Sequence, residues 1–328
     1  MELTGKTEIT SGALLGQAVG DAFGVPVEFL SRTQVRAMDL REMIGADSDP
    51  QQATQWGTRI PKGSWSDDTS MTAASMDSFV RKGGSIDYED QMAAFVRWWD
   101  HGEYCCLSYP FGLGGNVSAS LDRFRKGMPA LQCGGRGIMD NGNGALMRIL
   151  PFSLHCIFRQ LDEDKTAAVT GNGSAITHGH AISRMCCFVW TEFLRALVEG
   201  AGLSGAIEHI ESLPYGKWFS DSTLEELSFI TQRKIRTISE HDIGETGYVV
   251  DTLYSALYSL IHADDYESSV RNAVNLGYDT DTAGAVTGMA AGILYSADGI
   301  PERWLGTLRR REYLEMLAGK FAECENGF

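Results

Sequence analysis

Two short segments of the chain carry more oxygen ligands than a helix start requires. Residues 66–69 read Ser-Asp-Asp-Thr and residues 279–282 read Asp-Thr-Asp-Thr, each just before a helix-like run. One aspartate or serine there is enough to cap a helix and to offset its macrodipole. Adjacent carboxylates repel one another unless a cation, hydrogen-bond donors or solvent relieve them. The surplus therefore indicates a cation site, with simple capping as the alternative for each segment.

The chemistry that these residues favour is that of a divalent cation. Mg²⁺ and Mn²⁺ prefer oxygen ligands. Four carboxylates with neighbouring hydroxyls suffice for two ions, which together can orient a substrate and activate a water molecule. The two segments lie far apart in the sequence, so the fold must bring them together, and their spacing does not show that they meet.

The N-terminal region supplies another acidic candidate. Gly12, Gly16 and Gly20 share one face of a predicted helix, which permits close contact with another helix. Pro26 disfavours helical structure in the residue before it and predicts the end of this helix. Glu28 follows the break, and it is either an exposed loop glutamate or a part of the site.

Two central segments suit a polar ligand. Residues 140–148 read DNGNGALMR, in which glycines expose backbone N–H groups ahead of a predicted helix. This arrangement suits a phosphate, although it lacks the P-loop pattern and a turn without a ligand is commoner. His178 and His180 could bind a metal, but a histidine that contacts a polar ligand or caps a helix is commoner.

Taken together and in their order along the chain, these segments resemble the ADP-ribosylglycohydrolase family, which includes the dinitrogenase-reductase-activating glycohydrolases. The resemblance extends from about residue 10 to about residue 295. It implies an all-α fold around two Mg²⁺ or Mn²⁺ ions and hydrolysis of the ribosyl C1″ bond, with release of ADP-ribose. The matching motifs are GQAVGDAFG at 16–24 with Glu28, WSDDT at 65–69, GNGA at 142–145 with Met147 and Arg148, TH at 177–178, GYVV at 247–250, and DTDT at 279–282 with Gly277.

The resemblance also implies roles for individual residues. Glu28, Asp67 and Asp281 would be catalytic, with Glu28 acting as a gate, a base or a residue that positions water. The implied metal ligands are Ser66, Asp67, Asp68, Asp279, Asp281 and Thr282. The residues implied to bind the ADP part are Gly142, Asn143 and Gly144 around the diphosphate, with His178 and Tyr248 beside them.

One segment departs from the family pattern. Family members that release ADP-ribose from arginine often carry Phe-Asp-Ile-Gly-Asn where this chain has Phe-Gly-Leu-Gly-Gly at 111–115. Gly112 then replaces an aspartate associated with proton transfer, and Gly115 replaces an asparagine that Asn116 could supply only after a one-residue shift. The departure either argues against arginine-linked substrates or transfers the acid–base role to Glu28. The acceptor stays open among arginine, serine, another side chain and a small molecule.

A different class of function remains as an alternative. The same fold can serve as a binding or immunity protein, or as a structural protein similar to a lens crystallin, with little or no hydrolase activity. Four clustered carboxylates argue against a purely structural role, because without a cation they would reduce stability.

The elements that must position these residues are predicted to be helices. We expect an all-α, compact orthogonal array of helices that forms a single domain over residues 1–328, because no linker or solenoid repeat divides the chain. Residues 31–60 are predicted to form an irregular loop beside Glu28 that moves when substrate binds. Apolar residues recur at three- and four-residue spacing in 9–25, 69–82, 88–101, 180–199, 248–262, 266–276, 283–296 and 308–322.

The composition bounds the class of protein and its partners. Of the 328 residues, 43% are hydrophobic and 22% charged, as in ordinary soluble globular proteins. The formal net charge of −15 disfavours nucleic acid as a partner. The first residues do not resemble a signal peptide, no apolar run is long enough for a membrane span, and seven cysteines lack metal-type spacing. We expect a reduced, cytoplasmic protein whose partner is its ADP-ribosylated protein or small-molecule substrate.

Overall fold

The computed structural model describes residues 1–46 and 60–326, and its regular elements are all helical. The described residues contain two isolated β-bridges and no β-strand, which confirms the predicted all-α class. Each helix predicted from periodicity has a counterpart whose ends lie within a few residues of the prediction, except that the first begins earlier, at Leu3. Of the predicted loop at 31–60, residues 47–59 lie outside the described residues, and the remainder includes α2 (Arg32–Ala37).

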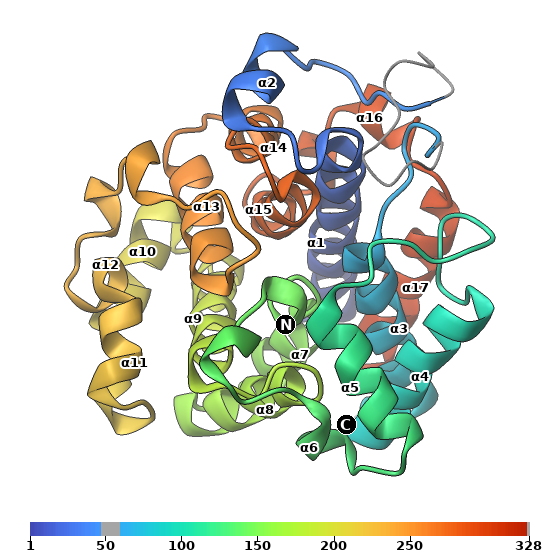
Figure 1. Ribbon diagram of the computed structural model, residues 1–328, viewed down its shortest axis with the longest axis vertical. Helices are drawn as coiled ribbons and strands as arrows, with labels where there is room; N and C mark the ends of the chain where they lie inside the picture. Colours follow the sequence, from blue (N-terminus) through green and yellow to red (C-terminus); the bar gives the residue numbers. More distant parts are fainter. Residues whose placement is uncertain (47–59, 327–328) are drawn as a thin grey trace.

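Two helices from opposite ends of the chain pack side by side at the centre of the molecule (Figure 1). They are α1 (Leu3–Gly24) and α15 (Thr280–Leu294). A Cβ atom added at Gly20 would lie closer than 3.0 Å to the Gly284 carbonyl oxygen, a separation that real Cβ atoms essentially never show. The backbones therefore touch along a stripe of glycines, as the sequence predicted. The facing pairs are Gly12 with Gly292, Gly16 with Gly288, and Gly20 with Gly284.

The other helices enclose this pair (Figure 1). Beside α1 lie α3 (Asp67–Arg81) and α17 (Arg311–Cys324), and α4 (Tyr88–His101) packs against α3. Toward the opposite side lie α9 (Ala181–Val198), α13 (Val249–Ile261) and α14 (Tyr266–Val274). The remaining α-helices are α5 (Gly115–Arg125), α6 (Ala130–Cys133), α7 (Leu150–Phe158), α8 (Glu163–Ala175), α10 (Gly202–Ser212), α11 (Asp221–Glu226), α12 (Ser228–Thr231) and α16 (Glu302–Leu305).

The buried apolar side chains form one contiguous cluster that draws on helices from both ends of the chain. Four tryptophans are fully buried in it, and they anchor α4, α9, α16 and the segment before α3. All seven cysteines are free thiols, and all but Cys324 are buried, as expected for core residues. No helix in the described part of the chain combines the length and apolar character needed to cross a membrane.

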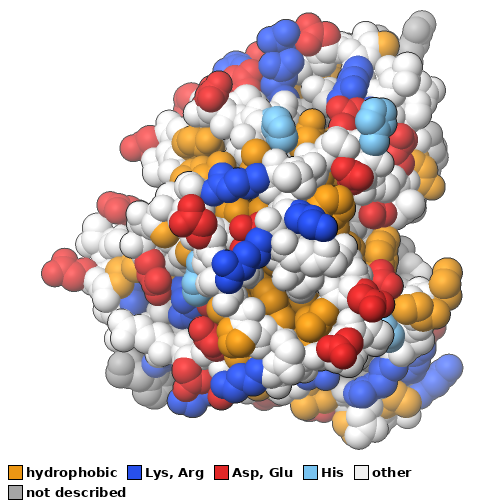
Figure 2. Space-filling view, turned by 90° about the vertical axis from the view of Figure 1, so that its left-hand side faces the viewer, with side chains coloured by type: hydrophobic (Ala, Val, Ile, Leu, Met, Phe, Trp, Pro, Cys, Tyr) orange, Lys and Arg blue, Asp and Glu red, His pale blue; other side chains and the backbone are white. Residues whose placement is uncertain are grey.

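Charge is unevenly distributed over the surface. Figure 2 shows the side that holds α11 and α12, where Lys and Arg side chains gather near the middle and acidic side chains surround them. The net charge of −15 is therefore not spread evenly over the protein surface. Part of the acidic excess is inside the protein, because several aspartates are buried where α1, α3 and α15 meet.

Candidate active site

The two acidic helix starts meet, although more than two hundred residues separate them in the chain. Asp67 and Asp68 begin α3, and Asp279 and Asp281 lie at the start of α15. All four line one cavity of about 350 Å³, together with Glu28. The fold therefore gathers five acidic side chains into a single space, which neither segment indicates when it is read alone.

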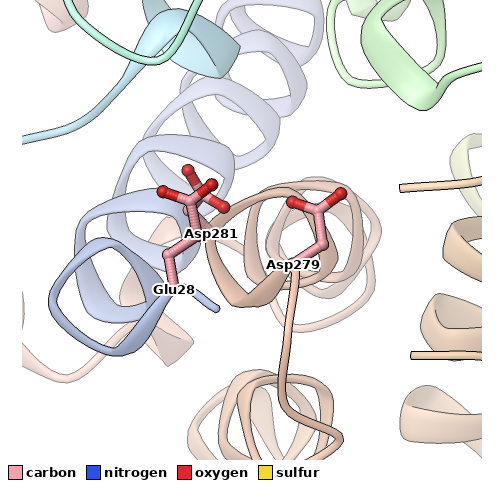
Figure 3. A group of neighbouring side chains, drawn as sticks. All are labelled: Glu28, Asp279 and Asp281. Atoms are coloured by element: carbon pink, nitrogen blue, oxygen red, sulfur yellow. The ribbon is translucent and has the colours of Figure 1, made fainter. Parts of the chain in front are cut away.

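The oxygen atoms in this cavity fit a hard divalent cation. Glu28, Asp279 and Asp281 each offer a carboxylate oxygen, and these atoms lie within 4.8 Å of one another. Figure 3 shows the carboxylates of Glu28 and Asp281 side by side, with Asp279 next to them at the same helix start. The Oδ1 atom of Asp68 is buried without a hydrogen-bond partner among the described residues, and Thr282 Oγ1 lies 3.4 Å from its Oδ2. An orphaned buried carboxylate oxygen among such neighbours is what a metal site requires.

The electrostatics of the cluster point the same way. Burial raises the pKa of Asp67, Asp68 and Asp281 well above the usual value, and neighbouring carboxylates raise it further. Burial also raises the pKa of Asp279, against the hydrogen bond from Asn143. A cation in the cavity would reverse these shifts, because a nearby opposite charge favours the ionised carboxylate.

A buried aspartate that precedes the cluster holds the start of α3. Asp21 accepts hydrogen bonds from the Ser66 N–H (2.9 Å), the Thr69 N–H (3.1 Å) and the Thr69 hydroxyl (2.7 Å). Burial raises its pKa to about 6 despite these bonds. The Ser66 hydroxyl caps the helix by accepting from the Asp68 N–H and also donates to Asp68 Oδ2 (3.1 Å). Gln17 Nε2 donates to the Asp68 carbonyl at 3.2 Å, so a side chain of α1 also holds the start of α3 in place.

The start of α15 is held differently. Asp279 occupies the N-cap position but makes no side-chain capping bond. Instead, Asn143 Nδ2 donates to Asp279 Oδ2 at 2.6 Å and to Thr252 Oγ1 at 2.9 Å. The Asn143 backbone N–H donates to the Gly247 carbonyl at 3.0 Å. The described N–H donors of Asn143 are therefore all bonded to other parts of the protein. Asn143 acts as a strut that connects Asp279 to α13.

His178 faces the cavity as a neutral side chain. It is 2% exposed, and burial together with the nearby Arg148 lowers its pKa to about 3. The Nε2–Cε1 edge of its ring lies against the backbone of Gly142 and Gly144. A Cβ atom at Gly144 would lie 3.0 Å from Cε1, so glycine leaves room for the ring.

Tyr248 lies outside this cavity, in an adjoining hollow of about 500 Å³. Its hydroxyl donates to Glu226 at 2.8 Å, and Met139 at the same hollow is 88% exposed. The cavity and the hollow adjoin each other, because Asn116, Gly142 and Gly247 line both.

The two glycines that replace family residues in the segment 111–115, Gly112 and Gly115, have different surroundings. Gly112 has φ +91°, and a Cβ atom there would lie closer than 3.0 Å to Asp67 Oδ1. A side chain at this position meets both an unfavourable backbone and the acidic cluster. Around Gly115, at the start of α5, no described atom lies within 4 Å of an added Cβ. Gly115 therefore opens space beside the cavity, Gly112 does not, and Asn116 lines the wall next to them.

Two aromatic residues stand at the cavity wall in the left-handed backbone region. Phe29 has φ +64° and Tyr278 has φ +65°, and their rings meet edge to face with centroids 5.8 Å apart. The Phe29 N–H donates to the Tyr278 carbonyl, and the Tyr278 N–H donates to the Leu30 carbonyl at 2.7 Å. Non-glycine residues in this region are strained, and such strain concentrates at ligand sites. The paired turns hold Glu28 and Asp279, which are their immediate neighbours.

The structure thus brings most of the predicted site residues to one cavity, and Ser66 and Tyr248 are the exceptions. Ser66 lies behind the wall as the α3 cap, and Tyr248 lines the adjoining hollow. Sequence reasoning assigned no role to Gln17 or Asp21, which support the ligands from α1. The sequence did contain a signal for this supporting role, because both polar residues lie in a helical stretch composed otherwise of small and apolar residues.

The profile of the ADP-ribosylglycohydrolase family matches residues 5–327. The chain therefore belongs to the ADP-ribosylglycohydrolase family of enzymes. A solved structure described as an ADP-ribosylglycohydrolase-related protein complex superimposes with a TM-score of 0.75 and 28% sequence identity. That match covers 98% of this chain and 99% of the other.

Similar proteins carry names that describe the reaction. The chain is 30% identical to an ADP-ribosylarginine hydrolase Tri1 of Serratia proteamaculans, over 94% of this chain and 77% of the relative. It is 28% identical to the ADP-ribosyl-[dinitrogen reductase] glycohydrolase of Rhodospirillum rubrum, over 90% of this chain and 89% of the relative.

Proposed function

We propose that this protein is a divalent-metal-dependent hydrolase that cleaves the ribosyl C1″ bond of ADP-ribosylated substrates and releases ADP-ribose. The observation that carries the proposal is the convergence of Asp67, Asp68, Asp279 and Asp281 with Glu28 in one cavity. The family membership and the names of the relatives support the reaction class.

The acidic residues would hold two Mg²⁺ or Mn²⁺ ions, with Thr282 as a neutral oxygen ligand. Such ions supply charge stabilisation at a substrate oxygen and lower the pKa of a bound water. Glu28 lines the cavity. In this proposal its carboxylate accepts a proton from the attacking water. No serine or cysteine nucleophile is needed for this chemistry.

The ADP part of the substrate would extend from the cavity past the shared wall residues into the adjoining hollow. His178 and the Gly142–Gly144 loop border the path of the diphosphate. Tyr248 and Met139 provide apolar surface in the hollow, where an adenine ring could stack on the tyrosine.

We favour an arginine-linked, ADP-ribosylated protein as the substrate. Two relatives are named for arginine-linked or dinitrogen-reductase substrates. The absence of the family aspartate at Gly112 does not create an empty pocket, because Asp67 fills that space. Glu28 would then carry the acid–base role. Phe29 and Tyr278 offer ring surfaces beside the carboxylates, which suits a cationic acceptor.

A substrate panel tests this proposal. Arginine-, serine- and acidic-linked ADP-ribosylated proteins are assayed for released ADP-ribose with Mg²⁺, with Mn²⁺ and with EDTA. We expect release from the arginine-linked substrate that EDTA abolishes. Release that is undiminished by EDTA contradicts the metal dependence. If no substrate is turned over while calorimetry detects ADP-ribose binding, a binding protein is the better description.

A further inference from the structure

A buried arginine lies directly behind His178. Arg148 is fully buried, and its Nη2 donates to the Gly173 carbonyl at 3.0 Å and to Thr177 Oγ1 at 2.6 Å. Its guanidinium carbon lies 4.9 Å from the centroid of the Phe95 ring. Among the described residues no carboxylate pairs with it, and its Nε and Nη1 atoms have no hydrogen-bond partner. Burying an unpaired cation is costly, so this position needs a reason.

The hydrogen bonds around Thr177 indicate the direction of its hydroxyl proton. An arginine can only donate, so Thr177 Oγ1 accepts from Arg148. The hydroxyl has one proton, and its acceptor within the described contacts is His178 Nδ1 at 3.0 Å. A protonated Nδ1 would leave the hydroxyl proton of Thr177 without a described acceptor, so these contacts favour an unprotonated Nδ1. In a neutral imidazole the proton then belongs to Nε2.

The edge of the ring that carries this proton faces the ligand space. Nε2 lies beside Gly142, which lines both the cavity and the adjoining hollow. Burial and the same buried cation both oppose a second proton on the ring, in agreement with a His178 pKa of about 3. His178 therefore presents a donor without a net charge.

We infer that Arg148 and Thr177 are positioning residues that lock His178 in its Nε2–H tautomer and aim that N–H at an oxygen of the bound ADP-ribosyl group. The inference rests on the proposed function for the identity of the ligand and on geometry for the tautomer.

The tautomer is measured by ¹⁵N NMR of the histidine rings in the full-length, metal-free protein at neutral pH. His178→Gln identifies the signals of His178 among the seven histidines. We expect an unprotonated, hydrogen-bonded Nδ1 and a protonated Nε2. A protonated Nδ1 in the wild-type protein overturns the inference, whatever the variants do.

Two substitutions at one position separate the hydroxyl from the shape of the side chain. Thr177→Val removes the hydroxyl and keeps the branching, whereas Thr177→Ser keeps the hydroxyl. In Thr177→Val the Nδ1 signal should change to that of an unbonded or tautomerically averaged nitrogen, and the affinity for ADP-ribose with Mg²⁺ should fall by up to about tenfold, the value of one hydrogen bond. Thr177→Ser should retain the wild-type signal and affinity.

The outcomes distinguish this inference from the proposed function. A Thr177→Val protein with wild-type His178 signals, or with altered signals and unchanged ADP-ribose affinity, overturns the positioning role. If the wild-type protein shows the expected tautomer but binds no ADP-ribose, the proposed function fails and the tautomer lock stands. Should Thr177→Val not fold, the wild-type spectrum still decides the tautomer.

Discussion

The two acidic helix starts look alike in sequence but are built differently. At α3, Ser66 caps the helix and Asp21 binds the backbone, so the carboxylates of Asp67 and Asp68 remain for the cavity. At α15, Asp279 stands at the N-cap without capping, and Asn143 holds its carboxylate in place. The Thr280 hydroxyl binds the Gly24 carbonyl at 2.8 Å and anchors this start to α1.

The difference shows that capping and ligand binding are separate tasks at both sites. At α3 the serine caps the helix, so the two aspartates that follow it are not needed for capping. At α15 the aspartate occupies the cap position, but its carboxylate binds Asn143 rather than the helix backbone. Capping alone therefore does not explain either segment. In both, a second polar residue from another part of the chain supports the start: a carboxylate at α3 and an amide at α15.

Removing one carboxylate from either start should have the largest effect. We expect Asp67→Asn and Asp281→Asn each to reduce the rate of ADP-ribose release by about a hundredfold to a thousandfold, since each removes charge stabilisation at the reacting group. Without metal, Asp281→Asn should be at least as heat-stable as the wild type, because its buried neighbours repel it.

The exposed Asp264 provides the matched control, and Asp264→Asn should leave the rate unchanged. Wild-type rates in either cavity variant would show that the corresponding helix start is structural only.

Exchanging the two supports should have a smaller effect. Asp21→Asn turns an amide donor toward groups that themselves donate, and Asn143→Asp places another carboxylate against Asp279. Residues that hold metal ligands typically contribute 10–100-fold in metal affinity or activity, so a loss of about that size is expected for each. Mn²⁺ calorimetry measures it, with circular dichroism to verify the fold. An unchanged Mn²⁺ affinity in Asn143→Asp would contradict the strut role.

Adding a methyl group within the glycine stripe should reduce the stability of the protein. A methyl group at Gly20 would collide with the Gly284 backbone, so we expect Gly20→Ala to lower the free energy of unfolding by about 1–3 kcal/mol. Gly319 in α17 has no described atom within 4 Å of an added Cβ, and Gly319→Ala should raise that free energy by about 0.5–1 kcal/mol. Urea unfolding measures both, and equal effects would show that α1 and α15 can separate at little cost.

The acidic cluster should make stability depend on pH and on metal. A carboxyl group whose pKa is raised on folding keeps its proton when the unfolded chain has lost it, so its contribution to stability is lost as pH rises between the two values. For Asp21 this window runs from 3.8 to about 6, and for Asp67, Asp68 and Asp281 the pKa is raised in the same direction.

Mn²⁺ should therefore raise the Tm above its value in EDTA, by an amount that grows from about pH 4 to pH 7, because the ligands must be ionised to bind. Calorimetric scans in Mn²⁺ and in EDTA measure this difference. A difference that does not change with pH would place the bound metal away from these carboxylates.

Much of the fold and the site could be predicted because periodicity and motif order are local signals. The long amphipathic helices were found in this way. Helix α7 was missed because it is apolar on most sides and nearly all buried, so it has little period to detect. Helix α8 was missed because its Gly171 and Gly173 resemble a loop. The supports Asp21 and Asn143 required contacts between distant segments, which no single stretch of sequence displays.

The glycine stripe also sets a length scale for assembling the site. Glycines recur every fourth residue along α1 and α15, so the next register in which their backbones could mesh is displaced by about 6 Å along the axis. Three carboxylate oxygens of the cavity lie within 4.8 Å of one another, which is less than that step. A shift by one such step would carry Glu28, which follows α1, away from Asp279 and Asp281, which lie together at the start of α15. Substitutions in the stripe should change the fraction of competent molecules rather than the affinity of each one.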